Sequence, residues 1–123
     1  MDKRVLTICL STDNIHGGYF YADLSLPAKG YEILDAYQKL RCGSRDDDPL
    51  VSEIRCKILP ELSEVRLDVP TIKELDFFAR RLAALSDAER LALRGLFLRF
   101  LNDDMPDHLV SMKDLINMTY GLD

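Results

Sequence analysis

Alternation of apolar and polar residues near the start of the chain predicts a β-hairpin. Residues 4–11 read Arg-Val-Leu-Thr-Ile-Cys-Leu-Ser, and their apolar or β-branched side chains fall on both faces, as in a central or well-covered strand. A turn cluster that ends in two glycines follows, and residues 19–25 alternate again as a second strand. Residues 51–58 repeat the alternation, so we expect a third, half-buried strand there.

Apolar residues at steps of three and four predict helices elsewhere in the chain. The first helix is expected over residues 28–41, directly after Pro27, a residue suited to the start of a helix. Its apolar stripe drifts around the helix through Tyr31, Leu34, Tyr37 and Leu40. The same spacing predicts a helix from Thr71 to Leu85 and another that starts at Asp87. The second of these has a broad apolar face, which comprises Leu91, Leu93, Leu96, Phe97, Phe100 and Leu101.

Residues that cap helices indicate where the last three helices begin. Thr71 precedes the first of them, and Ser86 is followed by Glu89 at the spacing of a capping box. In such a box the serine hydroxyl accepts a hydrogen bond from the glutamate N–H, while the glutamate carboxylate accepts one from the serine N–H. Ser111 caps a short C-terminal helix, and residues 102–106 are expected to form the loop before it.

These elements together predict an α+β fold in a single domain over residues 1–123. A small three-stranded antiparallel sheet has a helix directly after its hairpin and is followed by a C-terminal helical hairpin plus a short helix. The helical layer is expected to cover one face of the sheet. A chain of 123 residues buries enough surface to fold without a disulfide or a metal ion.

Composition favours a soluble globular protein of the cytoplasm. Apolar residues make up 47% and charged residues 30%, and no stretch approaches the roughly 20 apolar residues of a membrane span. The first residues lack the apolar core of a signal peptide. Cys9, Cys42 and Cys56 are odd in number and form no CxxC pair, which favours a reducing compartment over a disulfide framework.

No cluster of residues in the sequence predicts catalysis, a metal site or a cofactor site. His16 and His108 are far apart and lack the paired spacing of zinc ligands. Cys9 and Cys56 fall on the expected interior faces of strands, where a thiol acts as a small apolar side chain. Cys42 is expected to be the most exposed thiol, but it has no histidine beside it in the sequence. We therefore expect a protein that is not an enzyme and has no cofactor.

Charge is distributed unevenly along the chain, whose net charge is −5. Residues 51–100 hold nine basic and eight acidic residues, whereas residues 101–123 hold one and five. A candidate basic face lies on the predicted helical hairpin and comprises Arg80, Arg81, Arg90 and Arg94. Its ordinary interpretation is a solvated face with intrahelical ion pairs. Because nucleic-acid binders usually carry a net basic domain, direct nucleic-acid binding is not expected.

Two segments together resemble one known family. Residues 26–40 begin Leu-Pro-Ala-Lys-Gly-Tyr-Glu, at a predicted strand end that runs into a helix. Residues 72–96 contain Phe-Phe-Ala-Arg-Arg-Leu-Ala-Ala-Leu-Ser-Asp-Ala-Glu and resemble the helical hairpin of ArdA-type antirestriction proteins of conjugative elements. The resemblance extends over residues 26–101. It implies kinship with non-enzymatic acidic dimers that imitate DNA and occupy the DNA site of restriction enzymes.

DNA mimicry requires carboxylates at the spacing of phosphates. The candidate acidic patch comprises Asp46, Asp47, Asp48, Asp103, Asp104 and Asp107. We therefore expect an antirestriction-like protein of a mobile element that binds a protein partner, with a restriction–modification enzyme as the candidate and a homodimer left open. Two alternatives remain: a protein-interaction module without antirestriction activity, and a DNA-binding accessory protein that uses the arginine face.

Overall fold

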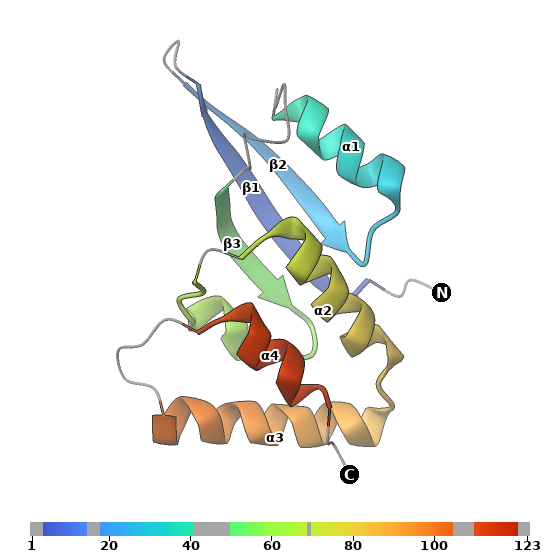
Figure 1. Ribbon diagram of the computed structural model, residues 1–123, viewed down its shortest axis with the longest axis vertical. Helices are drawn as coiled ribbons and strands as arrows, with labels where there is room; N and C mark the ends of the chain where they lie inside the picture. The colour runs from blue at the N-terminus through green and yellow to red at the C-terminus, as the bar shows by residue number, and fades with distance from the viewer. Residues whose placement is uncertain (1–3, 15–17, 41–49, 69, 105–109, 121–123) are drawn as a thin grey trace.

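The computed structural model of the protein describes residues 4–14, 18–40, 50–68, 70–104 and 110–120. In this part of the chain, three strands and four α-helices are accompanied by one short 3₁₀ helix (Figure 1). Their order is β1 (Leu6–Asn14), β2 (Gly18–Leu26), α1 (Gly30–Lys39), β3 (Leu50–Cys56), η1 (Pro60–Glu64), α2 (Ile72–Ala84), α3 (Asp87–Asp104) and α4 (Met112–Met118). The α+β fold class predicted from the sequence is confirmed.

The strands form one antiparallel sheet in the order β2-β1-β3, so β1 is central, as predicted. Ile8 of β1 lies opposite Leu24 of β2 and Ile54 of β3, and all three side chains are buried. The register of β1 against β3 shifts between Cys9 and Leu10. One face of the sheet therefore carries apolar side chains across all three strands and forms one wall of the core.

The opposite face of the sheet is polar. Cys9 is half-buried there, between its exposed pairing partners Asp23 on β2 and Glu53 on β3. The expectation that Cys9 faces the interior is therefore wrong, because successive strand side chains alternate between faces and Cys9 lies opposite to Ile8. Cys56 is buried as expected, and burial raises the pKa of its thiol.

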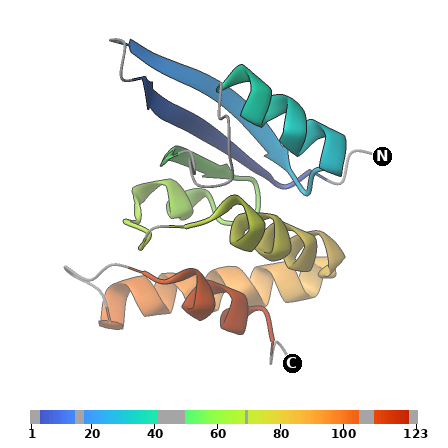
Figure 2. The ribbon, with the colours of Figure 1, turned by 45° about the horizontal axis from the view of Figure 1, so that its top comes forward.

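Helices cover the apolar face of the sheet in two layers. Figure 2 shows α2 and η1 next to the sheet, with α3 and α4 beyond them. Phe78 of α2 and Phe97 of α3 are fully buried, and they share one hydrophobic cluster with Leu115 of α4 and Leu6 of β1. A single core therefore connects the sheet to both helical layers.

The predicted helix caps are confirmed by hydrogen bonds. The Glu74 N–H donates to Thr71 Oγ1 at 3.1 Å, and the Thr71 N–H donates to Glu74 Oε1 at 3.2 Å. Glu89 and Ser86 exchange the same two bonds at 3.2 and 3.0 Å. Ser111 Oγ accepts a hydrogen bond from the N–H three residues later, at 3.1 Å. Each cap supplies a partner to an N–H group that has none within its own helix.

Helix α3 is longer and less one-sided than the sequence predicts. It continues through Asp104, into the expected loop, because no residue before Pro106 is incompatible with a helix. Leu93 and Phe97 are buried, whereas Leu91 is 74% exposed. Leu91 lies two positions before Leu93, which corresponds to about 200° of rotation, so the two side chains lie on opposite sides of the helix. In the described residues, α3 included, no helix is both long and apolar enough to cross a membrane.

Helix α1 buries a different side from the predicted one. It begins at Gly30, two residues later than expected. Tyr31 and Leu34 of the predicted apolar stripe are 67% and 65% exposed, whereas Ala36 and Leu40 are buried. Because a helix has about 3.6 residues per turn, a stripe at steps of three turns back by about 60° per step. Tyr31 and Leu40 consequently lie on opposite sides of the helix.

Candidate functional site

A groove of about 670 Å³ lies between β2 and α1. It is bounded by residues 23–25 of β2 and residues 31–39 of α1, with Arg4 also lining it, and we call it the β2–α1 groove. Figure 1 shows α1 running beside β2 on the side away from β1. The groove therefore lies along one edge of the sheet, next to a helix that exposes large apolar side chains.

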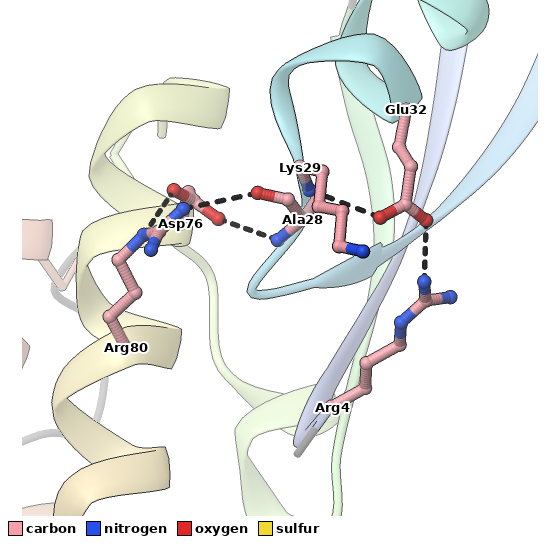
Figure 3. Close-up of polar contacts among 6 residues, drawn as sticks. All are labelled: Arg4, Ala28, Lys29, Glu32, Asp76 and Arg80. Atoms are coloured by element: carbon pink, nitrogen blue, oxygen red, sulfur yellow. Dashed lines mark hydrogen bonds and ion pairs between the residues drawn. The ribbon is translucent and has the colours of Figure 1, made fainter. Parts of the chain in front are cut away.

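Side chains of α2 hold the connection that leads into α1. Asp76 Oδ1 accepts a hydrogen bond from the Ala28 N–H at 2.9 Å, and Arg80 Nη2 donates one to the Ala28 carbonyl at 3.1 Å (Figure 3). Arg80 Nε and Asp76 Oδ2 form an ion pair at 2.8 Å. Because Ala28 is buried, these bonds satisfy backbone groups that have little access to water. We call this pair the Asp76–Arg80 latch.

Both ends of α1 are tied to β1 or to the residues before it. Arg4 Nη2 and Glu32 Oε2 form an ion pair at 2.6 Å, and Glu32 Oε1 accepts a hydrogen bond from the Lys29 N–H at 3.1 Å (Figure 3). At the other end of the helix, Thr12 Oγ1 donates to the Leu40 carbonyl at 2.8 Å. These contacts and the latch together fix the position of α1 against β2, and with it the width of the groove.

The groove combines exposed apolar surface with charges that are largely paired. Tyr31 and Leu34 present the apolar surface. Lys39 Nζ and Asp35 Oδ2 form an exposed ion pair at 3.3 Å. Asp23 is exposed and makes no hydrogen bond or ion pair within the described part of the chain. The uncompensated charge of the groove is therefore negative.

Asp23 also lies near a cation on the polar face of the sheet. Arg55 Nε contacts Glu53 Oε1 at 3.2 Å, and this hydrogen bond and the charge of Glu53 raise the pKa of Arg55, with a smaller contribution from Asp23. Arg55 has Glu53 as its ion-pair partner, and the Asp23 side chain is itself exposed.

The first two arginines of the predicted basic face contact separate segments of the chain. Arg80 belongs to the latch and holds Ala28. Arg81 donates from Nε to Thr119 Oγ1 at 3.1 Å and from Nη2 to the Thr119 carbonyl at 3.0 Å. Its guanidinium also lies over the ring of Tyr120, 3.9 Å from the ring centroid. These two neighbouring residues therefore contact a segment that precedes α1 and a segment that follows α4.

The other two arginines of this face also have intramolecular partners. Arg90 Nη2 donates to the Ala83 carbonyl at 3.4 Å, and its Nε is buried without a partner among the described residues. Arg94 Nη2 contacts Glu61 Oε1 at 2.6 Å. This hydrogen bond raises the pKa of Arg94 and lowers the pKa of Glu61. Each of the four arginines therefore has part of its hydrogen-bonding capacity engaged within the chain.

Most of the predicted acidic patch lies outside the described residues. This holds for Asp46, Asp47, Asp48 and Asp107. Asp103 and Asp104 form the last residues of α3, and their side chains also lie outside the description. His16, His108 and Cys42 are outside it as well. The acidic patch therefore stays a prediction.

Sequence reasoning missed the β2–α1 groove. The available signal was the rotation of the Tyr31–Leu40 stripe, which requires that one end of the stripe faces away from the core. No family model matches the chain, and neither a curated protein nor a solved structure matches it.

Proposed function

We propose that the protein is a non-enzymatic protein-binding domain whose β2–α1 groove receives a segment of a partner protein. The observation that carries this proposal is the exposure of Tyr31 and Leu34 on a helix whose position is fixed at both ends. Tyrosine is enriched among residues that dominate binding energy at interfaces. A preformed groove also reduces the conformational entropy lost on binding.

The chemistry of the groove supports a peptide partner over a small molecule. Sites for small molecules are mostly apolar and enclose most of the ligand. The β2–α1 groove instead carries Arg4, Asp23, Glu32, Asp35 and Lys39 along its walls. None of its described lining residues is a cysteine or histidine. Such a mixed surface suits a partner that brings both apolar and polar side chains.

Antirestriction-like action on a restriction–modification enzyme is a narrower form of the same proposal. It is supported by the resemblance of residues 72–96 to the helical hairpin of ArdA-type proteins. In this form, the partner segment belongs to a restriction–modification enzyme and the acidic patch adds to the contact.

A displayed library of random peptides tests the proposed function. Peptides enriched on the wild-type protein are synthesised with a fluorophore, and their affinity is measured by fluorescence polarisation. We expect Leu34→Ser to weaken binding by about tenfold, because it removes buried apolar area from the interface. Leu91→Ser makes the same change at an exposed position of α3 and serves as the matched control.

Circular dichroism checks that both variants keep their fold, which is expected since both side chains are exposed. An affinity that falls with Leu34→Ser and not with Leu91→Ser supports the groove as the binding site. Failure to enrich any peptide, or equal loss in the two variants, contradicts it.

A further inference from the structure

We propose that the segment bound in the β2–α1 groove is an extended peptide that adds a fourth strand to the sheet at the outer edge of β2, with a Lys or Arg side chain against Asp23. This inference depends on the proposed function and names its partner chemistry.

The outer edge of β2 provides the backbone partners for such a strand. In the described residues β2 pairs only with β1, over a register from Gly18 to Leu26. An edge strand leaves alternate N–H and C=O groups directed away from the sheet. An extended peptide satisfies these groups by ladder hydrogen bonds, and this mode of recognition supplies affinity that depends little on peptide sequence.

Helix α1 provides the second wall of the binding site. The groove of about 670 Å³ lies between it and residues 23–25 of β2. Alternate side chains of an added strand point to opposite faces. One set would therefore contact Tyr31 and Leu34, while the other set would face solvent.

A helix beside an edge strand sometimes serves only to protect that edge. Such a helix turns one apolar side toward the protein, as α1 does with Ile33, Tyr37 and Leu40. Here Tyr31 and Leu34 line the groove and yet remain about two-thirds exposed. The groove between β2 and α1 is therefore open on the side of Tyr31 and Leu34. An added peptide strand would cover this exposed apolar surface.

The charges of the groove specify the side chain that the peptide brings. Glu32 is paired with Arg4, and Asp35 is paired with Lys39. Asp23 lies on the β2 wall and has no such partner in the described part of the chain. A cationic side chain in the peptide would complement it, whereas an acidic one would be repelled.

The test uses the peptides enriched on the wild-type protein, resynthesised with one backbone amide N-methylated at a time. N-methylation removes a single hydrogen-bond donor. If the peptide forms a strand, only alternate amides bond to β2, so alternate N-methylations should weaken binding by about tenfold and the others should change it little. Hydrogen exchange should show that alternate amides of β2 become protected in the complex.

The charge component is tested by Asp23→Asn, with Asp68→Asn as a matched control at another exposed aspartate. We expect Lys or Arg at one fixed position of the enriched peptides and about fivefold weaker binding to Asp23→Asn only. Unchanged affinity for Asp23→Asn, or enrichment of acidic peptides, overturns this component.

Failure of strand addition and failure of the proposed function give different results. Binding that depends on Leu34 but tolerates N-methylation at every position overturns strand addition and leaves the groove as a binding site. Binding that is insensitive to Leu34→Ser overturns both proposals. An alternating N-methylation pattern together with dependence on Leu34 supports both.

Discussion

The guanidinium of Arg81 lies over the ring of Tyr120, with its central carbon 3.9 Å from the ring centroid. The same guanidinium donates two hydrogen bonds to Thr119, the buried C-cap residue that follows α4. One side chain of α2 therefore docks the end of the last helix through charge, hydrogen bonds and stacking at once.

Removal of this docking side chain should destabilise the fold. We expect Arg81→Ala to lower the free energy of unfolding by about 1–3 kcal/mol, because it removes the hydrogen-bond donors of a buried carbonyl and a cation–π contact. Arg81→Lys should lose part of this amount, since an ammonium group cannot reproduce the planar fork. Urea unfolding measures the stability of both Arg81 variants. Lys73→Ala, at an exposed position of the same helix, is the control. Equal stability of Arg81→Ala and the control would contradict the docking role.

The capping box at the start of α3 gives a second prediction for stability. Ser86→Ala should lower the free energy of unfolding by about 0.5–2 kcal/mol, because the Glu89 N–H loses its acceptor at 3.2 Å. Ser86→Asp should retain most of the stability, since aspartate also caps helices well. The two variants are compared by chemical denaturation. If alanine and aspartate behave alike, the cap does not contribute as stated.

Loss of the Asp76–Arg80 latch should affect both stability and the groove. Asp76→Ala leaves the buried Ala28 N–H without its acceptor, and we expect the free energy of unfolding to fall by about 1–3 kcal/mol. Because the latch also positions α1, the variant should bind enriched peptides more weakly even where it is folded. Asp68→Ala serves as the control at an exposed aspartate. A destabilised variant with unchanged peptide affinity would show that the latch does not set the groove.

The contact with Arg94 makes the contribution of Glu61 to the free energy of unfolding depend on pH. The hydrogen bond from Arg94 lowers the pKa of Glu61 in the folded protein, so the contribution is present above the ordinary glutamate value of about 4.3 and is lost as pH falls through the lower folded-state value. Glu61→Gln should therefore be less stable than wild type at neutral pH, and the difference should shrink on acidification. Unfolding curves at a series of pH values measure this. Glu64→Gln in the same turn is the control, and a difference that grows in acid would contradict the assignment.

Intramolecular contacts of the arginines predict the outcome of DNA-binding assays. Arg80, Arg81, Arg90 and Arg94 each have a partner within the chain, so we expect no direct binding to duplex DNA at physiological salt in gel-shift assays. Submicromolar binding that is lost on Arg90→Ala and Arg94→Ala would favour the DNA-binding alternative.

Inhibition of a restriction enzyme tests the antirestriction-like proposal separately. We expect at most weak, salt-sensitive inhibition, because a net charge of −5 is small for a mimic of duplex DNA. Neutralisation of residues 46–48 should reduce any inhibition further. Inhibition that is strong and independent of these aspartates would contradict DNA mimicry as its basis.

The helix caps and the strands were determined by the sequence itself. Ser86 and Glu89 are three residues apart, and both of their hydrogen bonds join only those two residues. Alternation in residues 4–11 likewise predicts the strand that β1 forms. Such features could be predicted because the atoms that decide them lie within a few residues of one another.

The β2–α1 groove was decided by the tertiary structure. Asp76 and Arg80 form the latch with Ala28 although they lie 48 and 52 positions further along the chain. These bonds select which side of α1 is buried. Arg94 meets Glu61 across 33 positions in the same way, so the predicted basic face is divided among partners that no local pattern indicates. Sequence periodicity gives the apolar side chains of a helix but not its rotation about its own axis, because that rotation is set by the contacts at its ends. Tyr31 and Leu34 consequently line an open groove in place of a buried stripe.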